Sequence, residues 1–157
     1  MAKSADRDYE LWVLLHQARD AVFRVRENEL ASVGLTAMQA AVLFIIKSIE
    51  GPAVPAEIAR WIFREHHTVS GLLNRMEKEG LVKKTKGRPQ RNMITVEITE
   101  KGEQAYTRSR ELKSVHRIMS GLSAGDKTSL RRCLQTTRNR ALIAFNESKK
   151  TDAFPFP

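Results

Sequence analysis

The sequence predicts a mainly α-helical chain with one small β-hairpin, an α+β fold in which long helices flank a compact centre. Three observations lead to this prediction. Apolar residues recur every three to four positions over most of the chain, which is the helical period. Between Leu81 and Ile98 the period changes to two, as in a pair of strands. Capping residues, glycines and prolines divide the rest of the chain into separate helices.

Length and charge limit the class of protein. The chain has 157 residues, enough for one domain with a buried core. Its 27 Lys and Arg against 18 Asp and Glu give a net charge of +9, which predicts a polyanionic partner, either nucleic acid or an acidic membrane surface. Residues 55–101 carry 10 basic and 6 acidic side chains, and residues 102–150 carry 11 and 4. Charge alone therefore does not single out one region.

The first two predicted helices cover residues 8–31 and 36–49. The first is apolar over more than one face, so we expect it to be central or shared with a second subunit. The second begins with a capping box formed by Thr36 and Gln39 and ends before Gly51.

A helix–turn–helix follows. Pro55 suits the first turn of a short helix, and a second helix over residues 66–79 ends at Gly80, which can take the left-handed conformation. The inner face of the second helix is expected to be apolar and its outer face small, polar or basic, as suits contact with bases and phosphates. The inner residues are Val69, Leu72, Leu73 and Met76; the outer ones are His66, His67, Thr68, Ser70, Gly71, Asn74 and Arg75.

The predicted hairpin pairs Leu81–Lys86 with a strand in which Ile94, Val96 and Ile98 point to one face, across a turn at residues 87–90. The run from Leu81 to Arg91 holds five basic residues and no acid. A helix pair followed by a basic hairpin is an arrangement that reads duplex DNA. The alternative is a charged edge strand that only discourages aggregation.

Two helices complete the chain. Thr99 caps a long helix predicted over residues 100–121, and Ser123 with Asp126 opens the last one. The single cysteine, Cys133, excludes an intramolecular disulfide and falls on the apolar stripe of the last helix, so we expect a buried, unreactive thiol; an oxidation sensor is the alternative. No apolar run is long enough for a signal peptide or a membrane span, so we expect a soluble cytoplasmic protein.

Three strings occur in order at consistent spacing: LTAMQ at residues 35–39, TVSGLLNRMEKEGL at residues 68–81 and ITEKG at residues 98–102. Together they make the chain resemble the MarR family of winged helix–turn–helix regulators over residues 8–147. The resemblance implies a DNA-binding region at residues 36–100, and dimerisation helices at residues 1–35 and 101–157 that form one intertwined domain with it. It also implies a cytoplasmic homodimer, most often a repressor, that binds a pseudo-palindromic operator and can be released by a small aromatic effector.

Carried over by position, the resemblance makes the helix over residues 66–79 the recognition helix and residues 81–98 the wing, with Arg91 as the wing arginine. Three positions depart from the usual pattern. Gln90 replaces an acid beside Arg91, Asn74 replaces an acid before Arg75, and Gly71 replaces a longer side chain. Gly71 serves either close helix packing or close approach to DNA. The expected DNA-binding residues are His66, His67, Thr68, Ser70, Gly71, Asn74, Arg75, Lys83, Lys84, Lys86, Arg88, Gln90 and Arg91.

The sequence gives weaker evidence for other kinds of site. Trp12, His16, Met38 and Phe44 are candidates for an effector pocket, although such residues at helical spacing usually belong to a core. His66 and His67 point about 100° apart on a helix and cannot easily share an ion, so we expect no metal site. With no cofactor motif and no catalytic constellation, an enzyme is not expected. The alternative to a specific regulator is a non-specific architectural DNA-binding protein, which the basic residues 102–150 favour.

Overall fold

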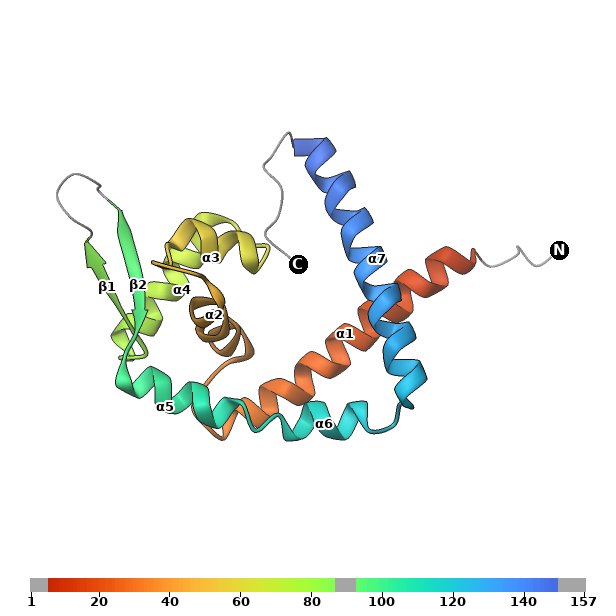
Figure 1. The fold of residues 1–157 in the computed structure, drawn as a ribbon, viewed down its shortest axis with the longest axis horizontal. Coiled ribbons are helices and arrows are strands. Elements are labelled where there is room, and N and C mark those ends of the chain that lie inside the picture. Colours follow the sequence, from red (N-terminus) through yellow and green to blue (C-terminus); the bar gives the residue numbers. More distant parts are fainter. Residues whose placement is uncertain (1–5, 87–92, 150–157) are drawn as a thin grey trace.

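The computed structural model describes residues 6–86 and 93–149. Residues 37–86 and 93–98 form a winged centre, and long helices extend from it (Figure 1). In chain order the elements are α1 (Arg7–Ala31), α2 (Ala37–Ser48), α3 (Pro55–Trp61), α4 (His66–Lys78), β1 (Val82–Lys86), β2 (Ile94–Ile98), α5 (Glu100–Ser109), α6 (Lys113–Met119) and α7 (Ala124–Lys149). Helices α1 and α5–α7 form the lower and right-hand part of the view, and α2–α4 with the hairpin form the left-hand part. None of the described helices is long and apolar enough to cross a membrane.

The predicted helix starts are confirmed. The Thr36 hydroxyl accepts a hydrogen bond from the Gln39 backbone N–H at 3.1 Å, and the Gln39 side chain accepts one from the Thr36 N–H at 2.9 Å. Thr99 caps α5 by accepting from the Gly102 N–H at 3.1 Å. Ser123 and Asp126 form the same reciprocal pair before α7. These bonds use backbone donors that a helix leaves unpaired in its first turn.

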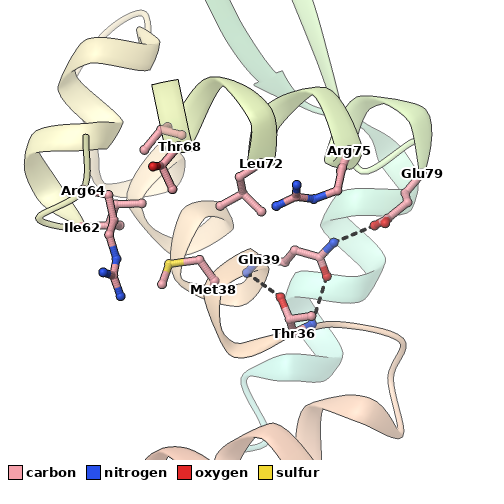
Figure 2. A pocket seen from close by; sticks show the side chains of 10 residues that line it. Thr36, Met38, Gln39, Ile62, Arg64, Thr68, Leu72, Arg75 and Glu79 are labelled. Atoms are coloured by element: carbon pink, nitrogen blue, oxygen red, sulfur yellow. Dashed lines mark hydrogen bonds between the residues drawn. The ribbon is translucent and has the colours of Figure 1, made fainter. Parts of the chain in front are cut away.

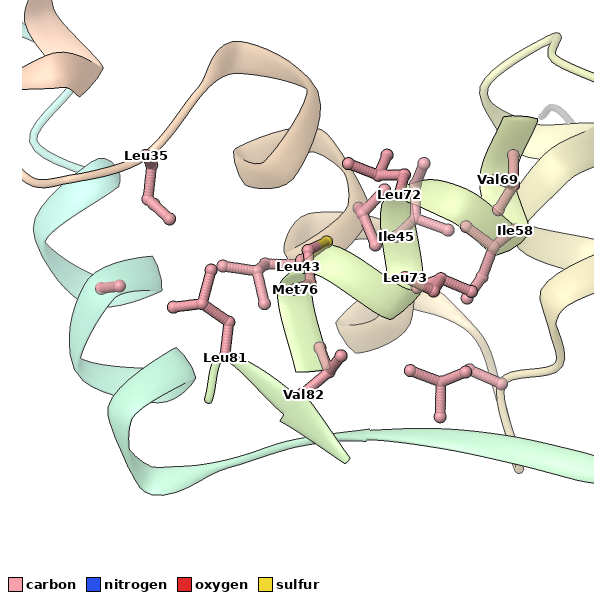
Figure 3. Close-up of a cluster of buried hydrophobic side chains, with 14 of the residues drawn as sticks. Leu35, Leu43, Ile45, Ile58, Val69, Leu72, Leu73, Met76, Leu81 and Val82 are labelled. Atoms are coloured by element: carbon pink, nitrogen blue, oxygen red, sulfur yellow. The ribbon is translucent and has the colours of Figure 1, made fainter. Parts of the chain in front are cut away.

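The hydrophobic core lies between α2, α3, α4 and the hairpin (Figure 3). The inner face of α4 is buried as predicted, and Leu43 of α2 lies against it with no exposed surface. β1 closes the core through Val82, and β2 closes it through Val96. The fully buried side chains of this core include Val42, Leu43, Ile58, Val69, Leu73, Met76, Val82 and Val96.

Two glycines fix how α4, the hairpin and α5 join. Gly80 has φ +73°, the left-handed conformation predicted for it, and so turns the chain from α4 into β1. Gly102 lies in the first turn of α5 directly against the Leu81 carbonyl, and an added Cβ would also come within 2.7 Å of Ile98. Only glycine allows α5 to pack this closely against the base of the wing.

The hairpin is antiparallel, with Val82 opposite Ile98 and Lys84 opposite Val96. The Val96 N–H donates to the Ala53 carbonyl at 2.8 Å, so the segment before α3 covers part of the outer edge of β2. The predicted alternation of Ile94, Val96 and Ile98 holds only near α5. Ile94 is 44% exposed, because it lies toward the tip and beyond the reach of the core.

The prediction of one helix over residues 100–121 is wrong. α5 ends at Ser109 and α6 begins at Lys113, because Leu112 has φ +52°, a left-handed conformation through which an α-helix cannot continue. The apolar period of this segment persists across the break, so the sequence pattern did not reveal it.

Two side chains of α1 hold this break. Arg26 donates to the Ser109 carbonyl at the end of α5 at 2.5 Å, and the Glu29 carboxylate accepts from the backbone and hydroxyl of Ser114 at the start of α6. Arg26 and Glu29 also form an ion pair at 2.7 Å. Partial burial opposes ionisation of Glu29, but the hydrogen bonds from Ser114 and Arg26 outweigh it and lower the pKa of this carboxyl to about 2. The α1 pair thus replaces hydrogen bonds that a continuous helix would make itself.

The terminal helices are less covered than the centre. In α1, Leu11 is 64% exposed and Trp12 is 54% exposed. α7 shares no extended contact with any other described element and stands away from the winged centre in Figure 1. The prediction that Cys133 is buried is therefore wrong for the single chain, because nothing within the described chain covers that face of α7 and the thiol is exposed.

Candidate nucleic-acid interface

The outer surface of α4 is a polar ridge. His67, Gly71, Asn74 and Lys78 follow one another at spacings of four, three and four residues, so they lie along one line of the helix. All but the half-buried Gly71 are exposed, and the opposite side of the helix is fixed in the core. The ridge is thus presented on a rigid support.

One flank of α4 faces α2 across a hollow of about 270 Å³ (Figure 2). Arg75 and Thr68 line this hollow rather than the centre of the ridge. The Gln39 amide, which is buried, donates to the Glu79 carboxylate at 2.6 Å and so ties the start of α2 to the end of α4. This bond fixes the position of α4 relative to α2.

The other flank faces the wing across a cleft of about 500 Å³. His66, Ser70 and Asn74 of α4 line it, and Lys84 of β1 lies opposite them. The structure therefore brings four of the predicted DNA-binding residues together in one place. Met93 and Ile94, both exposed, add an apolar wall that the sequence prediction did not include.

The lysines of β1 are less free than the sequence suggests. Lys83 forms an ion pair with Glu97 across the hairpin at 2.8 Å, and Lys84 forms one with Glu77 of α4 at 3.5 Å. The run from Leu81 to Arg91 contains no acid, but folding brings acids to it from β2 and α4. Lys86 is exposed at the end of β1.

The wing tip lies outside the described residues. This applies to Arg88, Gln90 and Arg91, three of the predicted DNA-binding residues, and to the turn at residues 87–90.

Gly71 does not pack closely against any other residue that the structure describes. Among those residues, a Cβ added at this position would meet no atom within 4 Å, so the interpretation as a close helix contact is wrong. Glycine costs about 0.5–1 kcal/mol relative to alanine inside a helix. The other interpretation, close approach of the helix to DNA, stays a prediction.

The structure places the four predicted effector residues in different surroundings. Trp12 and His16 lie on α1 with their ring centroids 4.2 Å apart, and Trp12 is exposed. Met38 lines the hollow between α2 and α4, whereas Phe44 lines a cavity of about 400 Å³ between α1, α2 and α5. Of the four predicted residues, Phe44 is the one that lines this cavity. The other residues around it include Arg26, Leu30, Tyr106, Arg110 and Leu112.

Two residues of the site were missed from the sequence. Lys78 lies on the ridge, and its spacing from Gly71 and Asn74 could have placed it there. Glu77 accepts the backbone N–H of Lys84 at 2.9 Å, a bond that depends on how the hairpin folds against α4. Among the residues that the structure describes, no three His, Cys, Asp or Glu side chains converge as a metal site would require.

A helix–turn–helix with a polar second helix, followed by a two-stranded basic hairpin, defines a winged helix–turn–helix protein. Residues 33–91, which span α2 to the wing, match the model of the MarR family. Over this part of the chain the protein is similar to the MarR family.

Individual relatives agree with this similarity. Over 95 residues the chain is 32% identical to the HTH-type transcriptional regulator TtmR of Methylorubrum extorquens (strain PA1). The matched residues make up 60% of this chain and 48%, about half, of TtmR. An organohalide-sensing regulator, RdhR, solved with 2,4-dichlorophenol bound, has a TM-score of 0.84 and 26% identity over 99% of this chain and 92% of its own. A mutant MarR from E. coli in complex with operator DNA shares the fold, with a TM-score of 0.77 and 18% identity over 87% of this chain and 99% of its own. TtmR and RdhR are transcriptional regulators.

Proposed function

We propose that the protein is a sequence-specific regulator of transcription that binds double-stranded DNA. The observation that carries this proposal is the polar ridge of α4, presented on a buried base and followed by a wing that bears lysines. A helix fits the major groove, and the wing lies where it can contact adjacent phosphates. Such a protein acts on chromosomal DNA and would work in the cytoplasm.

The acting unit is a homodimer. Residues 36–100 form the DNA-binding region, and the helices at residues 1–35 and 101–157 join two copies in one intertwined domain. The exposed apolar side chains of both terminal helices support this proposal, since single chains rarely leave so many uncovered. They are Leu11, Trp12, Leu14 and Leu15 in α1 and Leu130, Leu134, Ile143 and Phe145 in α7.

Leu134→Glu tests the dimer, because it places a charge on the exposed face of α7. We expect a shift from dimer to monomer in analytical ultracentrifugation, with loss of operator binding. Gln135→Glu adds the same charge at the neighbouring exposed position and serves as the matched control. A Leu134→Glu protein that remains a dimer at micromolar concentration would contradict this interface.

The regulator acts as a repressor that an effector releases. The cavity between α1, α2 and α5 supports a small aromatic effector, because Phe44 and Tyr106 supply apolar rings and Arg26 and Arg110 supply cations. It lies between the two proposed regions, where an occupant could favour one separation of the recognition helices over another. The dichlorophenol bound to RdhR is a ligand of this chemical kind.

Selection of bound duplexes from a random pool tests the DNA-binding function. We expect a pseudo-palindrome with half-sites about 10 base pairs apart and a preference of roughly 10³-fold over random DNA. Lys78→Ala and Arg91→Ala should each weaken binding and reduce its dependence on salt.

A non-specific architectural DNA-binding protein is the second candidate. The exposed basic residues of α7 favour it, because they lie outside the recognition helix: Lys127, Arg131, Arg132 and Arg140. A ratio near one between selected and random duplexes would establish this function in place of the first.

A further inference from the structure

Asn74 of the recognition helix is joined to the wing by Lys84, and this contact fixes which way its amide points. The Lys84 ammonium donates to Asn74. An ammonium has no acceptor, so the atom that it contacts must be the amide oxygen, Oδ1. The amide nitrogen, Nδ2, is then the group that Asn74 offers to a ligand along the exposed ridge of α4.

Lys84 is itself held in place. Its side chain is only 21% exposed, and its ammonium lies 3.5 Å from the Glu77 carboxylate. The second oxygen of Glu77 accepts the backbone N–H of Lys84 at 2.9 Å. Glu77 therefore fixes both the strand and the ammonium, one helical turn from Asn74 on the same helix.

We propose that Lys84 is a positioning residue that makes the Asn74 amide act mainly as a hydrogen-bond donor in the major groove, so that this position selects guanine over adenine. A free asparagine prefers adenine, because Oδ1 accepts from N6 while Nδ2 donates to N7. The Lys84 ammonium occupies one of the two lone pairs of Oδ1, and its positive charge beside the other disfavours the N6 amino group, so the pairing with adenine is weakened. Guanine instead presents two adjacent acceptors, O6 and N7, to the Nδ2 donor.

This inference rests on the proposed function, since it requires specific binding with α4 in the major groove. The test is selection of bound duplexes by the full-length protein and its variants. The wild type is expected to prefer guanine at one position of each half-site, and Lys84→Met to shift that position to adenine by roughly tenfold. Lys84→Arg keeps a donor-only cation and should retain guanine.

Lys83→Met is the matched control. It removes the same charge from the same strand, but Lys83 pairs with Glu97 instead of Asn74. It should lower the affinity for all sequences alike and leave the base preference unchanged. Because Glu77 binds the backbone of Lys84, the strand keeps this anchor in Lys84→Met, and a melting curve checks that the variant folds.

Asn74→Ala gives an independent reading at an exposed position. It should abolish the preference at the same base pair, and adding Lys84→Met to it should cause no further change there. An unchanged preference in Asn74→Ala, or guanine retained in folded Lys84→Met, overturns the proposal. A wild type with no preference at any position instead overturns the proposed function, and this inference with it.

Discussion

The winged centre and the terminal helices carry the same kind of apolar stripe, but only the centre buries its stripes within the single chain. Leu43 has no exposed surface, whereas Leu11 of α1 is 64% exposed and Leu134 of α7 is 45% exposed. Both kinds of residue lie at helical spacing among other apolar residues. An apolar stripe in the sequence therefore identifies a helix face that must be buried. Whether the same chain buries that face depends on the topology of the fold.

The largest effect should come from a core leucine. Leu43→Ala leaves a cavity between α2 and α4, and we expect a loss of about 3 kcal/mol in the free energy of unfolding, whatever the protein concentration. Leu134→Ala should cost little in dilute monomer and act mainly through association, so its effect on the melting temperature should depend on concentration. Equal and concentration-independent losses in chemical denaturation would remove the distinction between the two regions.

A glycine at the edge of the core gives the next largest effect. Gly102→Ala forces a methyl group onto the Leu81 carbonyl and Ile98, and we expect a loss of about 2 kcal/mol from overpacking. Gly125→Ala, in the first turn of α7 where an added Cβ meets only Ser123 at 3.8 Å, is the control and should be nearly neutral. Denaturant titration compares the two, and a neutral Gly102→Ala would mean that α5 can move away from the wing.

Glu29 lies where the two regions join. Glu29→Gln should lower the free energy of unfolding by about 1 kcal/mol at neutral pH, because hydrogen bonds to a charged carboxylate are lost. The folded pKa of about 2 lies below the ordinary value of 4.5, so this stabilisation is present above pH 4.5 and is lost as the pH falls toward 2.

Unfolding measured across that pH range checks the assignment. The difference between wild type and Glu29→Gln should shrink as the solution becomes more acid. Glu10→Gln, in the exposed first turn of the same helix, should leave the profile unchanged. A constant difference between pH 7 and pH 2 would show that the charge of Glu29 is not what stabilises the junction.

The smallest expected change is a gain. Gly71→Ala should raise the free energy of unfolding by about 0.5–1 kcal/mol, since a methyl group has open space there and alanine favours helix. If α4 approaches DNA closely at this point, the same variant should bind the operator more weakly in a gel-shift titration. Stabilisation without any change in affinity would contradict a role of Gly71 in DNA approach.

Local signals made the helix starts and the wing predictable. The caps at Thr36, Thr99 and Ser123 depend on residues within three positions, and so does the left-handed Gly80. The break at Leu112 could not be read in this way. It contains no proline or glycine, and its polar partners on α1 are more than eighty residues away in the chain.

In the candidate site too, local spacing predicted some features, whereas others depend on contacts that form only on folding. Helical spacing alone predicted the outer face of α4, although it did not show that Arg75 turns toward α2 while Asn74 turns toward the wing. The charge of the wing was overestimated, because Glu77 and Glu97 reach its lysines only after folding. Cys133 was expected to be buried because it lies on an apolar stripe. It is exposed because no other described part of the single chain covers that face of α7.

The break between α5 and α6 has a mechanical consequence. α7 has 26 residues and is therefore about 39 Å long, at 1.5 Å per residue. A rotation of about 10° at the joint would carry the far end of such an arm through roughly 7 Å, a displacement larger than one helical turn. By binding the end of α5 and the start of α6, the Arg26–Glu29 pair opposes such a rotation.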